Sequence, residues 1–136
     1  MEVSRLFFAN LSEFDSMMQW VRGHLRALVK DSSFIKQFEL AVEEALVNII
    51  TYAYSHPPGS IKISYAFEKE SGKISITLQD EGVPFNPLEV SEPIKKNQLE
   101  ECTEGGFGIF FMRKMTDSIL YERVGESNVL VLTKQL

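Results

Sequence analysis

The spacing of the apolar residues changes near residue 60, and this change limits what the chain can fold into. Between residues 11 and 54 the apolar residues recur every three or four positions, which is the period of a helix that buries one face. From residue 61 they alternate with polar residues, which is the period of a half-buried strand. Helices combined with paired strands are typical of an α+β fold. We therefore predict a two-layer α+β sandwich with helices on one face of a mainly antiparallel (mixed) sheet.

Cap and turn residues set the boundaries of the predicted elements. Asn10 followed by Glu13 is typical of a helix N-cap with its capping partner, and the residues over 31–33 can cap a second helix. The predicted elements are a strand over 3–9, helices over 11–30, 34–54 and 109–116, and strands over 61–67, 74–78, 119–124 and 129–133. The segment Pro84–Glu104 has no clear period, so we predict a long loop there. Loops of that length in a small domain are usually functional.

Length and composition fit one domain over residues 1–136 and exclude several classes of function. Of the 136 residues, 44% are hydrophobic and 24% charged, which is ordinary for a globular domain. The one cysteine, Cys102, and the two histidines, His24 and His56, are too few for a Cys/His zinc site and favour a reducing, cytoplasmic location. The net charge of -5 argues against direct nucleic-acid binding, and no apolar run is long enough to span a membrane.

The first chemical motif is the pair Glu44 and Asn48, which lie one turn apart on the second predicted helix. The residues around the pair are apolar, so both side chains can sit at the edge of a core within reach of a ligand. An asparagine oxygen can ligate Mg2+, and a glutamate can take a proton from a hydroxyl. A solvated helix face explains the pair equally well. Glu43 competes for the carboxylate role, but it lies about 140 degrees around the helix from Asn48.

The second motif, Asp80-Glu81-Gly82, stands where a predicted strand ends. A carboxylate at this place can accept a hydrogen bond from an exocyclic amine, and Gly82 lets a flat ring approach the backbone. An ordinary turn is the alternative explanation.

The third motif is the run Gly105-Gly106-Phe107-Gly108, directly before a predicted helix. Glycines there leave backbone N–H groups free to bind phosphate oxygens at the positive end of the helix dipole. The run lacks the lysine of a Walker A loop, and a flexible linker is the alternative. In this order, the carboxylate-amide pair, the strand-end aspartate, the long loop and the glycine run can enclose one nucleotide. We therefore predict that the ligand is ATP.

These residues resemble the GHKL ATPases, which have the Bergerat fold. The segment Glu44–Asn48 is similar to the N box of that superfamily, Asp80–Gly82 to its first glycine box, and Gly105–Gly108 to its second. The resemblance covers nearly the whole chain. The stretches AVEEALVNIITYAY, DEGVPFNP, GGFGIFFMRKMTD and VLTKQL resemble in particular the anti-sigma-factor serine kinases of the SpoIIAB and RsbW group.

The resemblance implies a homodimeric protein that holds a sigma factor inactive while ATP is bound and phosphorylates a serine of a STAS-domain anti-anti-sigma partner. It implies that Glu44 is the general base on that serine and that Asn48 ligates Mg2+. It further implies that Asp80, assisted by Gly82, binds the adenine amino group and that the glycine run, Phe107 included, lies along the phosphates. The segment over 84–104 would be the ATP lid.

Several alternatives remain beside the kinase. Phe107 stands where many relatives have arginine, so a nucleotide-gated binding switch without kinase activity is the second hypothesis, unless Arg113 or Lys114 compensates. A detached histidine-kinase domain would need a phosphoacceptor helix pair, which the chain does not offer. His24 has no acidic neighbour on its helix, and we predict it at the surface or at a dimer edge. Arg22 and Arg26 on the first helix, together with the sheet edge, are the expected partner contacts.

Overall fold

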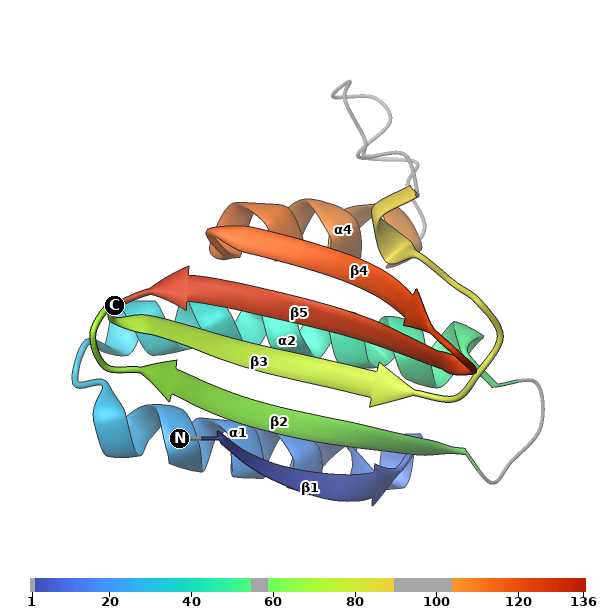
Figure 1. Cartoon of the computed structure of the whole chain (residues 1–136), viewed down its shortest axis with the longest axis horizontal. Coiled ribbons are helices and arrows are strands. Elements are labelled where there is room, and N and C mark those ends of the chain that lie inside the picture. The colour runs from blue at the N-terminus through green and yellow to red at the C-terminus, as the bar shows by residue number, and fades with distance from the viewer. Residues whose placement is uncertain (1, 55–58, 90–103) are drawn as a thin grey trace.

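One five-stranded sheet forms a whole layer of the molecule (Figure 1). The computed structural model describes residues 2–54, 59–89 and 104–136, with the side chains over 104–108 left outside the description. The strands are β1 (Glu2–Phe8), β2 (Ser60–Glu68), β3 (Lys73–Asp80), β4 (Ser118–Val124) and β5 (Ser127–Gln135). They lie in the order β1-β2-β3-β5-β4, and each described pair is antiparallel.

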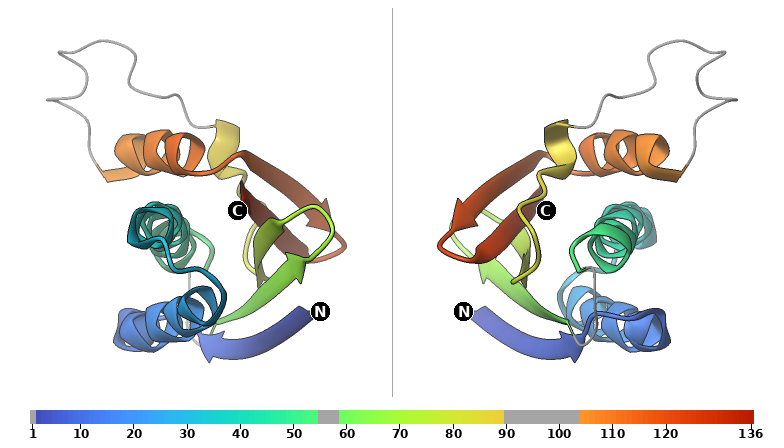
Figure 2. Two further views of the ribbon diagram at one scale, coloured as in Figure 1. Left: turned by 90° about the vertical axis from the view of Figure 1, so that its left-hand side faces the viewer. Right: turned by 90° about the vertical axis from the view of Figure 1, so that its right-hand side faces the viewer.

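The three α-helices of the described residues form the second layer, and they lie on the same face of the sheet (Figure 2). They are α1 (Phe14–Leu28), α2 (Ser32–Tyr52) and α4 (Glu104–Met115), and α2 lies between the other two. Two short 3-10 helices, η1 (Leu11–Glu13) and η2 (Pro87–Glu89), complete the described elements. The predicted α+β sandwich with helices on one face is confirmed.

The core lies between α2 and the sheet. Phe38, Ala41 and Leu46 of α2 are almost completely buried, as are the inward-facing residues of the central strands. Ile61 and Ile63 of β2 and the alternate residues of β3 and β5 supply the other side of the core. The apolar face of the helix and the apolar face of the sheet therefore pack against each other, as is usual in a two-layer domain.

The capping predictions hold, although the helix boundaries shift. Asn10 Oδ1 accepts from Glu13 N at 3.1 Å, and this cap starts η1, after which the α-helix begins at Phe14. Asp31 Oδ1 accepts from Ser33 N at 2.9 Å, so α2 begins at Ser32. A 3-10 turn at the start of an α-helix is a common way of satisfying its first donors.

The start of the third helix was predicted wrongly. We expected it after Gly108, but α4 begins at Glu104, and the glycine run forms its first turns. Each glycine lowers helix propensity by about 1 kcal/mol relative to alanine. Ile109 and Met112 of the same helix are fully buried, and such packing of an apolar face outweighs local propensity. Of the predicted loop over 84–104, residues 90–103 lie outside the described residues, as do Cys102 and His56.

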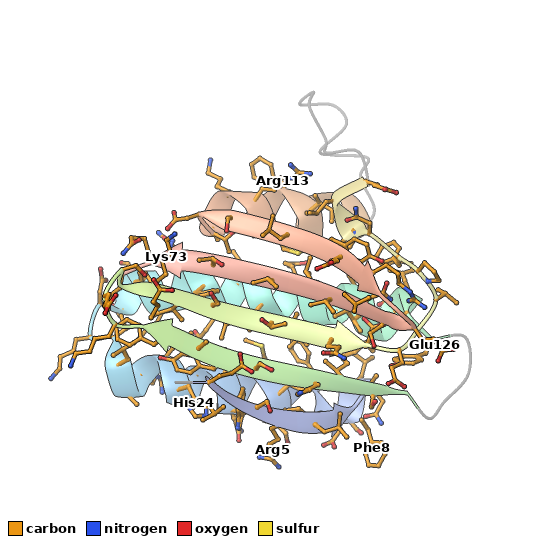
Figure 3. All side chains as sticks on the ribbon, viewed as in Figure 1. Arg5, Phe8, His24, Lys73, Arg113 and Glu126 are labelled. Carbon is orange, nitrogen blue, oxygen red and sulfur yellow. The ribbon has the colours of Figure 1, made fainter. Side chains whose placement is uncertain are left out.

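His24 is only partly exposed at the surface, and its predicted place at a dimer edge stays a prediction. Its ring lies 4.5 Å from the Trp20 ring and is stacked on Tyr65 at 5.1 Å between ring centres. Burial also raises the pKa of the Tyr65 hydroxyl. His24 of α1 therefore packs against β2 through Tyr65, and it is labelled in Figure 3.

The described helices give no sign of a membrane span. None of those within residues 2–54, 59–89 and 104–136 is both long enough and apolar enough to cross a bilayer.

The end of β3 is packed tightly against the end of α2 through Gly82. A Cβ placed on Gly82 would lie 2.0 Å from the Ala53 carbonyl oxygen. The same oxygen accepts from Val83 N at 2.8 Å. Tyr54 adds a second connection, because its hydroxyl donates to the Ser60 carbonyl oxygen at 2.6 Å and accepts from Glu81 N at 2.8 Å. Gly82 is thus needed for a close approach of two backbones.

We expect Gly82→Ala to lower the free energy of unfolding by about 2 kcal/mol, because the new methyl group must push α2 and the β3 turn apart. Gly23→Ala is the matched control, since nothing lies within 4 Å of a Cβ at that exposed position of α1. It should raise the free energy of unfolding by about 0.5 to 1 kcal/mol, because alanine is the better helix former. Urea titration followed by Trp20 fluorescence measures both. Equal effects of the two substitutions would contradict this account of Gly82.

Candidate functional site

A small pocket lies where one end of α2 meets the ends of β3 and β5. Most of its wall is apolar, and its polar groups come from elements far apart in the sequence. Its lining residues are Ala45, Asn48, Ile49, Ala53, Asp80, Phe85, Pro87, Tyr121, Asn128 and Leu130. An apolar pocket with a few converging polar groups is the usual form of a small-molecule site. Two residues that we predicted from separate motifs, Asn48 and Asp80, therefore face the same space.

Asn48 is the most unusual residue of the pocket. Only 6% of its surface is exposed, and its Nδ2 is buried without a hydrogen-bond partner among the described residues. A buried donor that has lost water without gaining a partner costs about 1 to 3 kcal/mol. Such a cost in a folded protein calls for an explanation, and a ligand that accepts from this amide supplies one.

Glu44 lies one helical turn before Asn48 and is half-buried. Glu43, the competing carboxylate, is exposed and lines a different surface, an open groove between α1 and α2. Glu43 therefore lies on a different side of α2 from Asn48, while Glu44 is not among the residues that line the small pocket. The role of Glu44 in chemistry stays a prediction.

The groove between α1 and α2 is larger, about 480 Å³, and charged side chains of both signs line it. Arg22, one of the expected partner contacts, forms an ion pair with Glu39 across this groove. Arg26, the other, is exposed. The groove is lined by no residue of the three motifs.

Asp80 is the last residue of β3, and its side chain is 3% exposed. Its Oδ1 accepts from Gly82 N at 2.9 Å, which makes the predicted turn, and from Asn128 Nδ2 at 2.9 Å. The turn and the ligand hypothesis are therefore compatible, because the turn is what holds the carboxylate at the pocket. Gly82 is needed for the close contact with Ala53, and the approach of a flat ring to its backbone stays a prediction.

The sequence analysis missed Asn128 and Tyr121. Asn128 is 4% exposed, lies opposite Asp80 in the ladder between β3 and β5, and receives a hydrogen bond from the Tyr121 hydroxyl. A signal was present in the sequence: Asn128 occupies an inward position, in step with the buried Leu130 and Leu132. A polar residue in the buried half of an alternating strand marks a candidate site.

The glycine run lies in the first turns of α4. Gly105 and Gly106 are among the first helical residues, whose backbone N–H groups have no partner within the helix. The side chain of Phe107 lies outside the described residues, and so does any contact of Gly108 beyond its place in the helix. The geometry of a helix N-terminus suits an anion such as phosphate.

Arg113 and Lys114 lie at the opposite end of α4 from the glycine run. At about 1.5 Å per residue, they are more than about 10 Å along the helix axis from Gly105. Arg113 Nη2 donates to the Leu88 carbonyl oxygen at 3.0 Å, and Lys114 Nζ lies 5.5 Å from the centre of the Phe110 ring. Figure 3 labels Arg113 on α4, at the upper margin of the view. Compensation by these cations for an arginine at position 107 is therefore not supported.

The pocket is narrow. It encloses about 10 Å³, which is the space of one water molecule. Phe85 and Pro87 form its outer wall, and the ring of Tyr52 lies 5.5 Å from that of Phe85. A purine is larger than the space that the described residues leave here.

The donors present fit a nucleotide better than a bare metal ion. The described residues contain no group of three His, Cys, Asp or Glu side chains that could hold a metal by themselves. Asn48 offers a single neutral oxygen, and Mg2+ usually combines one or two protein ligands with phosphate oxygens and water. Mg2+ would therefore be held by Asn48 together with the nucleotide.

Comparison with known proteins agrees with this geometry. The sequence pattern of the histidine kinase-like ATPase domain matches residues 7–134. The serine/threonine-protein kinase BtrW of Bordetella bronchiseptica is 28% identical over 94 residues, which are 69% of this chain and 66% of BtrW. The serine-protein kinase RsbW of Bacillus cereus is 27% identical over 94 residues, which are 62% of this chain and 54% of RsbW. The matches thus span between about half and two-thirds of these relatives.

A solved structure has the same fold. The crystal structure of the RsbU and RsbW domains of Rv1364c from Mycobacterium tuberculosis superposes with a TM-score of 0.71 at 14% sequence identity. The superposition covers 100% of this chain and 32% of that one. With the family pattern matched over nearly its whole length, the chain belongs to the histidine kinase-like ATPase domain family, the GHKL type that its three motifs resemble.

Proposed function

We propose that this protein binds ATP with Mg2+ and is a serine kinase that doubles as an anti-sigma factor. The observation that carries the proposal is the partnerless Nδ2 of Asn48, buried in the same pocket as the Asp80 carboxylate. These two polar groups are of the kinds that the metal-phosphate part and the amino group of ATP need. The names of the relatives BtrW and RsbW, both serine kinases, support the choice of reaction.

Each end of the nucleotide has its own group in the proposed site. Asp80, held by Gly82 N, accepts from the exocyclic amine of adenine. Asn48 offers Oδ1 to Mg2+ and Nδ2 to a phosphate oxygen. The backbone N–H groups of Gly105 and Gly106 bind further phosphate oxygens, and Gly108, in the next turn of α4, lies along the phosphates. Mg2+ supplies neutralisation of the phosphate charge, and the positioned donors supply the orientation on which phosphoryl transfer depends.

Glu44 is the proposed general base. It takes the proton of the acceptor serine hydroxyl as the serine oxygen bonds to the γ-phosphorus, and the bond from that phosphorus to the bridging oxygen of ADP breaks. The products are phosphoserine, ADP and a protonated Glu44. Its position one turn from Asn48 places the carboxylate on the side of α2 that also carries the proposed metal ligand.

The partners belong to the proposal as well. By resemblance, the acceptor is a STAS-domain anti-anti-sigma protein, the sequestered protein is a sigma factor, and the kinase is a homodimer in the cytoplasm. Arg26 is exposed on α1 and available for a protein contact, whereas Arg22 is already paired with Glu39.

One observation favours a second function, a nucleotide-gated binding switch without kinase activity. The two cations of α4, Arg113 and Lys114, lie in its last turn, away from the glycine run. With Phe107 in place of arginine, α4 then brings no described cation to the phosphates. Such a protein would bind ATP and change its partner affinity without transferring phosphate.

We expect calorimetric titration to show ATP binding that depends on Mg2+. Asp80→Asn should weaken ATP binding by at least about tenfold, since it removes a charged acceptor from the amine. Asn48→Ala should remove the Mg2+ dependence. Asp15→Asn on the exposed face of α1 is the matched control and should bind as the wild type does. Absence of binding by the wild type at millimolar ATP would refute the proposed nucleotide site.

Phosphate transfer to a STAS-domain partner should depend on Glu44 and not on Glu43. Loss of a general base lowers rates by about 100-fold or more, so we expect that loss for Glu44→Gln, with ATP affinity changed by less than about threefold. Glu43→Gln changes the same charge one residue away and should transfer phosphate normally. The assay measures labelled phosphoserine from γ-labelled ATP. Tight ATP binding without transfer by the wild type would favour the binding switch.

A further inference from the structure

The side-chain amide of Asn128, beside the Asp80 carboxylate, makes all the hydrogen bonds that it can make. Its Nδ2 donates to Asp80 Oδ1 at 2.9 Å and to the Val83 carbonyl oxygen at 2.8 Å. Its Oδ1 accepts from the Tyr121 hydroxyl at 2.5 Å and from Phe85 N at 3.3 Å. An asparagine amide has two N–H donors and two acceptor lone pairs, so these four bonds satisfy it.

Two backbone groups decide which way this amide faces. A backbone N–H can only donate, so Oδ1 must face Phe85, and a backbone carbonyl can only accept, so Nδ2 must face Val83. The second N–H of the amide then points at Asp80, and the Tyr121 hydroxyl is left to donate. The orientation is therefore set by the surrounding backbone and agrees with the charge of Asp80.

The consequence for Asp80 is a fixed carboxylate. Within the described residues, its hydrogen bonds from Gly82 N and Asn128 Nδ2 both end on Oδ1. Two donors on one oxygen hold the carboxylate in a single orientation and direct a ligand amine to Oδ2. Arg123 holds the same turn from outside, since its Nη1 donates to the Gly82 carbonyl oxygen at 2.8 Å.

The same amide also anchors the pocket wall. Val83 and Phe85 are both bonded to it, and Phe85 lines the pocket beside Pro87. One side chain from β5 therefore fixes both the carboxylate that faces the base and the start of the wall that covers the base.

We infer that Asn128 is a positioning residue that makes the site selective for a purine with an amine at position 6. The inference rests on the proposed ATP site and adds its source of base specificity. A purine with a carbonyl oxygen at that position, as in ITP, presents an acceptor to the Asp80 carboxylate and gains no hydrogen bond. Selectivity of this kind lasts only while the carboxylate is held in place, because a free carboxylate spends part of its time turned away from the adenine amine and loses that hydrogen bond.

The test compares ATP and ITP binding by calorimetry in the wild type, Asn128→Ala and Ser127→Ala. Ser127 is the matched control, because it precedes Asn128 on β5 and its hydroxyl accepts from Gln79 Nε2. The wild type and Ser127→Ala should prefer ATP by about tenfold or more, which is the effect of one hydrogen bond to a charged group. In Asn128→Ala we expect ATP affinity to fall while ITP affinity stays, so that the preference drops by about fivefold or more.

The ratio of the two affinities separates positioning from general damage. If ATP and ITP weaken by the same factor in Asn128→Ala, or if the preference is unchanged, the inference is wrong. Should Asn128→Ala fail to fold, Tyr121→Phe replaces it: loss of one hydroxyl bond to Asn128 should lower the preference by about twofold to threefold, and an unchanged preference overturns the inference.

The wild-type result keeps the two proposals apart. A wild type that binds neither nucleotide overturns the proposed function. A wild type that binds both equally well leaves an ATP site in place but overturns the role of Asn128 in base selection. Thermal unfolding of each variant without nucleotide, followed in parallel, shows whether the fold itself has changed.

Discussion

The structure depends on the burial of α2 against the sheet. This helix is the middle one of three, and its inward residues are closed off by β2, β3 and β5 on one side and by α1 and α4 on the others. Burial of apolar surface contributes about 25 cal/mol per Å², so the helix that buries the most apolar surface also contributes most to stability. The groups of the candidate site are placed relative to α2. Asn48 is on this helix, and Asp80 ends the strand β3, which packs against it. The turn after β3 is hydrogen-bonded to the end of α2.

Three buried polar residues gather at one end of the apolar layer. Asn48, Asp80 and Asn128 are each less than 10% exposed, and they gather where α2 ends and β5 begins. Burying polar groups is unfavourable unless they are hydrogen-bonded. Asp80 and Asn128 meet this condition through each other and through the backbone, while Asn48 does not. Asp80 and Asn128 thus form a framework whose hydrogen bonds are made within the protein. Asn48, in contrast, has a donor left for a ligand under the proposed function.

The sequence predicts most of the fold because its signals are local. The two periods, the caps at Asn10 and Asp31 and the turn at Asp80 all depend on neighbours in the chain. The failures come from contacts between distant residues. The start of α4 was misplaced because packing of Ile109 and Met112 outweighs glycine propensity. The ring contact of His24 was not predicted because nothing near it in sequence shows that Tyr65 will stack on it.

The candidate site follows the same rule. Glu44 and Asn48 share a helix, so their spacing alone places them on one side of it. Asn128 was missed because its pairing with Asp80 is a matter of strand register between residues 48 positions apart. Such a register is decided by which face of each strand is buried over its whole length, and a short motif does not carry that information.

The partnerless amide of Asn48 links stability to ligand binding. In the ligand-free protein it costs about 1 to 3 kcal/mol, and this cost is present in the folded state alone, because water satisfies the amide in the unfolded chain. A ligand that accepts from Nδ2 removes the cost on binding, so part of its affinity comes from relief of a defect rather than from a new contact. Any such ligand also stabilises the fold by mass action. An apolar residue at position 48 would give a more stable helix and no such coupling, so under the proposed function the cost of this buried amide is recovered only when the pocket is filled.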